Sequence, residues 1–126
     1  FLIIQQVFSD WIFPKGHSIR QETYKQTALR ELYEETNITK CKIIDGLNYI
    51  IKYSFSKNDD SIEKQVTFFL GLVDNIQAKK VSNKNSNGEV INIGWFSYED
   101  TLKKLTHKNH KTMLTKAFKY LKENYK

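Results

Sequence analysis

Apolar residues recur along this chain with two different periods, which predict strands in some segments and helices in others. Runs rich in β-branched and aromatic residues predict four strands, at 1–7, 42–54, 64–73 and 90–96. Helical spacing predicts one helix at 23–36 and two further helices after Ser97. This mixture of strands and helices predicts an α/β fold rather than a βαβ array.

The segment at 23–36 carries signals for both ends of a helix. Thr23 and Gln26 have the spacing of a capping box, and Asn37 readily takes the left-handed conformation that ends a helix. Three carboxylates fall within about 100° of arc on this helix: Glu31, Glu34 and Glu35. The neighbouring arc is apolar: Ala28, Leu29 and Leu32. We therefore expect one side of the helix to pack and the other to be acidic.

The remaining segments complete the predicted architecture. Residues 58–61 read as a hairpin turn between two strands, and residues 82–88 as a polar connection. Ser97 with Asp100 resembles a capping box at the start of the first C-terminal helix. An apolar stripe predicts the buried face of the last helix: Met113, Leu114, Ala117, Phe118 and Leu121.

Length and composition are those of one small domain, residues 1–126, which can bury a core without covalent staples. The single Cys41 excludes an internal disulfide and a zinc site built from several cysteines, which favours a reducing, cytoplasmic location. No apolar run approaches the ~20 residues of a membrane helix, and the first apolar residues lack the features of a signal peptide. The chain opens inside a predicted strand without Met, so we expect an N-terminal strand to be missing. We expect a monomer.

The densest chemical signal lies between Gly16 and Ile38. It reads Gly, five residues, Glu22, seven residues, then Arg30-Glu-Leu-Tyr-Glu-Glu. Glu31 and Glu35 stand at i and i+4, where like charges repel, so a positive group is expected beside them. Carboxylate oxygens suit Mg²⁺ or Mn²⁺ and leave room for substrate phosphates. A solvated acidic surface is the alternative for a bare Glu-Glu pair.

This pattern resembles the Nudix box, with Asn37 in place of the usual Gly. The resemblance implies a Nudix α/β/α sandwich with a central mixed sheet and a Mg²⁺- or Mn²⁺-dependent hydrolase of diphosphate linkages. Carried over by position, it makes Glu31, Glu34 and Glu35 metal-binding and catalytic residues, with Gly16 assisting through its carbonyl. It makes Arg30 and Glu22 a structural pair that holds loop and helix together.

The residues before the box resemble those of asymmetric diadenosine tetraphosphate hydrolases. The run is Trp11-Ile-Phe-Pro-Lys-Gly-His17, with Ile12 where that subfamily has Asp. Lys15 and His17 are then expected to reach toward a polyphosphate; an exposed basic loop is the alternative.

Two later segments extend the same resemblance. In the strand that starts at Lys64, Lys64 becomes a candidate phosphate contact and Phe68 a candidate for stacking on a purine, although a core role fits Phe68 equally well. Glu89, six residues before Trp95, becomes a candidate to complete the metal site. Tyr49, Tyr53 and Tyr98 are weaker candidates for a base.

The net charge of +6 would attract a polyanionic substrate. A basic cluster near the C-terminus either binds a phosphate backbone or is solvated surface: Lys103, Lys104, His107, Lys108, His110 and Lys111. The leading function is cleavage of diadenosine tetraphosphate to ATP and AMP. The alternatives are an enzyme acting on RNA 5′ ends, with RNA as partner, and a non-catalytic domain that senses a nucleotide.

Overall fold

The computed structural model describes residues 1–74 and 90–125, which form five strands and three helices in this part of the chain. In chain order they are β1 (Leu2–Gln6), β2 (Trp11–Ile12), α1 (Tyr24–Thr36), β3 (Lys42–Lys57), β4 (Asp60–Leu72), β5 (Val90–Trp95), α3 (Tyr98–Lys104) and α4 (Lys108–Asn124). The predicted elements are all present, and β2 is an additional short strand. The α/β class predicted from the sequence is confirmed.

The described strands form two sheets, and each pair within them is antiparallel. One sheet has the order β2-β1-β5, with Ile4 of β1 opposite both Ile12 and Ile93. The other consists of β3 and β4, joined as a hairpin. Where one central mixed sheet was expected, the described residues therefore show two separate antiparallel sheets.

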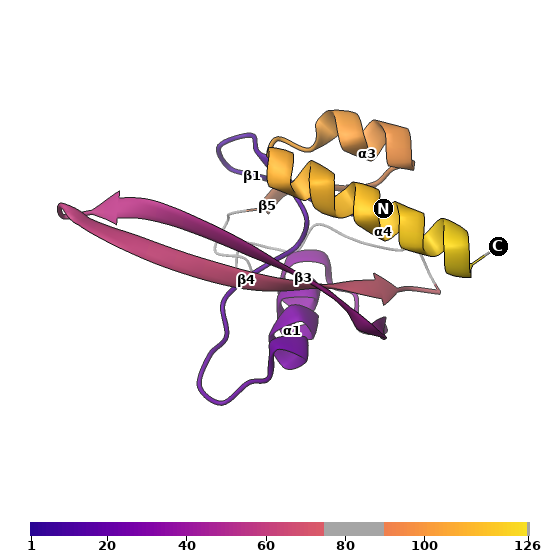
Figure 1. The fold of residues 1–126 in the computed structure, drawn as a ribbon, viewed down its shortest axis with the longest axis horizontal. Coiled ribbons are helices and arrows are strands. Elements are labelled where there is room, and N and C mark those ends of the chain that lie inside the picture. Colours follow the sequence, from indigo (N-terminus) through magenta and orange to yellow (C-terminus); the bar gives the residue numbers. More distant parts are fainter. Residues whose placement is uncertain (75–89, 126) are drawn as a thin grey trace.

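The β3–β4 hairpin is longer and its turn is tighter than the sequence pattern predicts. Asn58 and Asp59 form the turn, both with positive φ (52° and 67°), while Asp60 and Ser61 already belong to β4. Two left-handed residues in a two-residue loop are typical of a type I′ turn, whose twist matches that of the strands. The hairpin tip extends well beyond the rest of the molecule (Figure 1).

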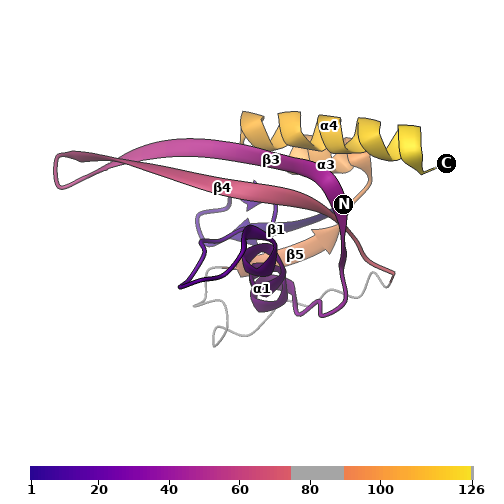
Figure 2. The same cartoon turned by 60° about the horizontal axis from the view of Figure 1, so that its bottom comes forward.

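The helices cover the two sides of the hairpin. Helix α4 runs along one side of β3 and β4 and α1 lies on the other, so the hairpin forms the middle layer (Figure 2). Alternate residues of β1 face opposite ways, as a strand requires: Ile3 packs with Leu105 and Leu114 of the C-terminal helical region, whereas Ile4 packs with Ile12 and Val90. A third cluster joins Val66 and Phe68 of β4 to Met113 of α4.

The ends of the helices follow the predicted signals. Thr23 caps α1 in a complete capping box with Gln26, and Asn37 ends the helix in the left-handed conformation with φ 64°. The Ser97 side chain accepts a hydrogen bond from the Asp100 amide at the start of α3. On α4 the predicted stripe is buried at Met113, Leu114 and Ala117, as expected. The described part of the chain contains no helix that is long and apolar enough to cross a membrane.

Candidate functional site

The loop that follows β2 lies directly against the glutamate-rich helix α1. Gly16 approaches the Glu31 side chain so closely that a Cβ at this position would overlap the Glu31 carboxyl group. Any larger residue at this position would displace the Glu31 side chain from where it now lies. The same loop is tied to α1 on either side of Gly16, because the Lys15 amide donates to Glu35 Oε1 (2.9 Å) and the His17 carbonyl accepts from Arg30 Nη2 (2.8 Å).

Arg30 is the centre of the charged network. Its Nε donates to Glu22 Oε2 (2.7 Å) and its Nη2 to Glu22 Oε1 (3.2 Å), which is the forked geometry of a strong ion pair. Its Nη1 also donates to Glu31 Oε1 (2.9 Å) and to Glu34 Oε2 (3.1 Å). The predicted Arg30–Glu22 pair is therefore present in the structure, and the contacts with Glu31 and Glu34 are additional.

This network shifts the pKa values of its members in opposite directions. The hydrogen bonds from Arg30 and from the Ile19 amide lower the pKa of Glu22 to about 2. Burial raises the pKa of Glu31, although Arg30 opposes that shift. The carboxylates likewise raise the pKa of Arg30, chiefly through the hydrogen bonds to Glu22. Burial thus disfavours the charged form of Glu31, and a nearby cation favours it.

Helix α1 does not have one purely apolar buried side and one purely acidic exposed side, as the sequence predicted. Glu35 is only 7% exposed, whereas Leu29 is 39% exposed and Leu32 half-buried. Glu35 turns inward because it accepts a hydrogen bond from the loop, and Leu29 and Leu32 instead line a cavity. The expectation of one packed and one acidic side was therefore wrong in part, since the loop covers an acidic position.

The donor chemistry of this region fits a hard divalent cation, because Glu31, Glu34 and Glu35 offer carboxylate oxygens on adjacent turns of one helix. In the conformation seen for residues 1–74 and 90–125, no three His, Cys, Asp or Glu side chains are grouped so that they could hold a metal ion. The positive group expected beside Glu31 is the Arg30 guanidinium here. Glu89 lies outside the described residues.

Cationic and aromatic side chains lie on the outer side of the same loop. Lys15 Nζ is 5.5 Å from the centre of the Tyr53 ring, and the Tyr53 hydroxyl lies 3.4 Å from His17 Nε2. Lys64 is the partner of Tyr53 across the hairpin. Burial lowers the pKa of His17, and the charges of Lys64 and Lys15 lower it further. The structure thus brings Lys15, His17 and Tyr53 together on the loop that is bonded to α1. Lys64 is near enough for its charge to act on His17, while its amine lies over the Phe55 ring, 5.3 Å from the centroid.

Phe68 and Tyr98 are used for packing. Phe68 is 7% exposed and meets the His110 ring edge-on, 5.4 Å between centroids. The Tyr98 ring stacks on Phe118 at 4.0 Å. Phe68 also lines the cavity beside the hairpin, and Phe118 occupies one face of the half-buried Tyr98 ring.

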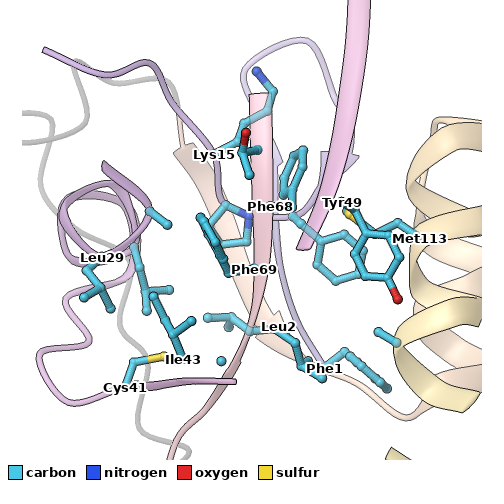
Figure 3. A pocket seen from close by; sticks show the side chains of 18 of the residues that line it. Phe1, Leu2, Lys15, Leu29, Cys41, Ile43, Tyr49, Phe68, Phe69 and Met113 are labelled. Carbon is cyan, nitrogen blue, oxygen red and sulfur yellow. The ribbon is translucent and has the colours of Figure 1, made fainter. Parts of the chain in front are cut away.

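A cavity of about 380 Å³ separates the hairpin from the β2-β1-β5 sheet. Lys15 lies at one end of it, with its amine directed away, while Leu29 and Ile43 line the side near α1 and Tyr49 and Met113 the side near α4 (Figure 3). The wall is mostly apolar, and the buried Trp95 Nε1 beside it has no hydrogen-bond partner among the described residues. The cavity adjoins the loop through Lys15 and Gly16.

Sequence reasoning missed the role of His110, which it placed in a basic surface cluster. His110 is 4% exposed, and burial first, then the charges of His107 and Lys15, lower its pKa to about 4. It is therefore a neutral, buried side chain at neutral pH. The remaining basic residues of that cluster are exposed or half-buried, and Lys104 lies over the rings of Trp11 and Phe96.

An α/β fold in which an arginine ties a glutamate-rich helix to the loop around Gly16 is the arrangement that the resemblance to the Nudix box implies. The chain belongs to this family, because the family model described as NUDIX domain matches residues 1–117.

Solved structures agree with this assignment. The chain is similar to an Ap4A hydrolase of C. elegans, solved as a binary complex, with a TM-score of 0.80 and 26% identity over 98% of this chain and 86% of that one. It also shares the fold of the E. coli dihydroneopterin triphosphate pyrophosphohydrolase (TM-score 0.69, 13% identity, 91% and 82% covered). A MutT protein from Methanosarcina mazei Go1 gives a TM-score of 0.63 at 24% identity, with 100% and 86% covered. The prediction of a Nudix pyrophosphohydrolase is confirmed.

Proposed function

We propose that this chain is a divalent-metal-dependent Nudix hydrolase that cleaves diadenosine tetraphosphate asymmetrically, giving ATP and AMP. One observation carries the proposal: the loop around Gly16 lies between two groups of side chains. The carboxylates of α1 lie on one side of it, and Lys15, His17 and Lys64 lie on the other. A polyphosphate needs both, because cations must hold its phosphates and acidic oxygens must hold the metal. The similarity to the C. elegans Ap4A hydrolase supports this choice of substrate.

The carboxylates of α1 supply the metal site in this proposal. Glu31, Glu34 and Glu35 would hold Mg²⁺ or Mn²⁺, with the Gly16 carbonyl assisting. The ion, when bound, neutralises phosphate charge and lowers the pKa of an attacking water. Before the ion binds, hydrogen bonds from Arg30 hold the side chains of Glu31 and Glu34 in place. The ion pair with Glu22 in turn fixes the Arg30 guanidinium. Glu35 fixes the loop through the Lys15 amide.

The cationic group would hold the substrate. Lys15 and Lys64 would carry positive charge toward the phosphates. Burial first, and then the charges of Lys64 and Lys15, lower the pKa of His17, which favours the neutral ring as a hydrogen-bonding group. Tyr53, held between Lys15 and His17, offers a half-buried ring and a hydroxyl at the same place. These residues orient the phosphate chain relative to α1 and contribute to specificity for a long polyphosphate.

Charge-neutral variants of the glutamates test the metal site. We expect Glu34→Gln and Glu35→Gln each to lower kcat by about 10²-fold or more, because loss of a metal ligand weakens binding of the transition state. Glu35→Gln is informative because the amide oxygen of glutamine can still accept from the Lys15 amide. Circular dichroism should show both variants folded. Exposed Glu123, near the end of α4, provides the control, and Glu123→Gln should leave kcat unchanged.

The substrate is tested by incubating the wild-type protein and Mg²⁺ with diadenosine tetraphosphate, 5′-triphosphate RNA, capped RNA and nucleoside triphosphates. Chromatography should identify ATP and AMP as the products from the first substrate. A preference for either RNA would replace the proposal by an activity on RNA 5′ ends. Binding without cleavage of any substrate would indicate a nucleotide-sensing domain, and unchanged turnover in both glutamine variants would overturn the assigned metal site.

A further inference from the structure

His110 is a buried titratable side chain for which the proposed chemistry has no use. It stands in the first turns of α4, far in sequence from the Nudix box, and only 4% of it is exposed. Its ring lies parallel to that of Phe13 (5.9 Å between centroids, 7° between planes) and edge-on to Phe68. Burying a polar ring between two phenylalanines costs free energy unless its nitrogens form hydrogen bonds.

His110 Nδ1 forms such a hydrogen bond. This atom accepts a hydrogen bond from the Phe13 amide (3.3 Å), which places the proton of the neutral imidazole on Nε2. Phe13 begins the loop that continues through Lys15 to Gly16 and His17. At neutral pH the low pKa of His110 keeps Nδ1 available as an acceptor.

The contact continues a row of bonds between the start of α4 and the chain around β2. Trp11 and Thr106 exchange two hydrogen bonds, of which the Trp11 amide donates one (2.8 Å) and the Trp11 carbonyl accepts the other (3.1 Å). His107 pairs with Asp10 at 3.1 Å. His110 is the last member of this row and the one nearest to the loop. It therefore ties the loop to α4, whereas the bonds from Arg30 and to Glu35 tie it to α1.

We infer that His110 is a positioning residue, which fixes the Phe13–His17 loop between α4 and α1 and so sets the place of Lys15 and Gly16 against the carboxylates. This inference rests on the proposed function for its effect on catalysis. The link from His110 to the loop can be measured independently of any reaction.

Two variants distinguish the contribution of the Nδ1 acceptor from that of the aromatic ring. His110→Asn keeps an acceptor near the position of Nδ1 and loses the ring, whereas His110→Phe keeps an aromatic ring and loses the acceptor. We expect amide hydrogen exchange at Phe13 and Lys15 to be at least about tenfold faster in His110→Phe, with a fall in kcat/KM of about tenfold. His110→Asn should retain kcat/KM within about threefold, even where its melting temperature falls further.

The opposite ordering would overturn the inference: a ring-only role predicts that His110→Phe resembles the wild type and that His110→Asn does not. Unchanged exchange at Phe13 and Lys15 in His110→Phe would also overturn it. If that variant does not fold, the ¹⁵N spectrum of wild-type His110 decides, because a proton on Nδ1 contradicts the hydrogen bond. Should the wild type cleave no substrate, the proposed function fails, while the exchange rates still decide whether His110 holds the loop.

Discussion

At the scale of single residues, Arg30 shows how one guanidinium can organise a helix that carries too much negative charge. It binds Glu22 through two nitrogens and also reaches Glu31 and Glu34, so it offsets the repulsion along α1. The same side chain also donates a hydrogen bond to the His17 carbonyl and so holds the loop against α1. A lysine could not replace it, because these bonds come from three different nitrogens of a planar fork.

The Arg30–Glu22 pair makes a prediction about stability in acid. The pKa of Glu22 in the folded protein is about 2, below the ordinary value of about 4.3. Its stabilising contribution is therefore complete above about pH 4.3 and is lost as the pH falls toward 2. We expect Glu22→Gln to be less stable than the wild type at pH 7, and the difference to shrink across that window.

Urea unfolding of both proteins between pH 2 and pH 7 measures this difference. Glu123→Gln serves as the matched control, since it makes the same chemical change at an exposed position and should follow the wild-type curve. A Glu22→Gln curve that stays parallel to the wild-type curve throughout would contradict the assigned ion pair.

The sequence could predict some of these residue roles and not others. Glu22, Arg30 and Gly16 stand at fixed spacings within one local motif, so their mutual contacts were predictable. His110 and Tyr53 reach the loop only through tertiary folding, and no local signal distinguishes a buried histidine from its exposed neighbours in a basic segment. Glu35 was expected on an open acidic face because helical periodicity cannot show that a loop covers that face.

At the scale of elements, the β3–β4 hairpin is the feature that extends furthest from the body (Figure 1). Its cross-strand pairs run from Lys57 opposite Asp60 to Asn48 opposite Phe69 before the register shifts. The sequence predicted both strands, although it ended one too early and began the other too late. Polar residues near the tip look like loop residues, but an exposed antiparallel pair accommodates them as readily.

The turn offers a test of the hairpin geometry. Asp59 has φ 67°, a conformation that costs an L-residue energy and that glycine adopts freely. We expect Asp59→Gly to raise the free energy of unfolding by about 0.5 kcal/mol, because Asn-Gly is the preferred type I′ pair. Ser56→Gly, two positions before Asn58 within β3, should instead lower it by about 0.5–1 kcal/mol. Equal destabilisation by both substitutions, measured by urea unfolding, would rule out the left-handed turn.

At the scale of the whole molecule, the relevant property is where its net charge of +6 lies relative to the site. Lys15 and Lys64 lie close enough to His17 to depress its pKa, whereas Lys108 stands at the start of α4 with Lys111 in the following turn. Composition alone could not separate these two groups, since the fold decides which lysines lie near His17. The class of fold was predictable from periodicity, but the arrangement of two sheets with a cavity between them depends on long-range pairing that periodicity does not encode.

The position of Lys15 and Lys64 near His17 predicts how salt affects activity. For a polyphosphate substrate we expect kcat/KM to fall by about tenfold as the salt concentration rises from low to near-molar values, because screening weakens the attraction of the substrate to the site. Removing two charges near the site in Lys15→Gln/Lys64→Gln should lower kcat/KM at low salt and flatten its salt dependence. Lys108→Gln/Lys111→Gln removes the same net charge elsewhere and should change both quantities little. If the second pair has the larger effect, and more so with a 5′-triphosphate RNA than with diadenosine tetraphosphate, the start of α4 binds a nucleic-acid backbone and the substrate proposed above is wrong.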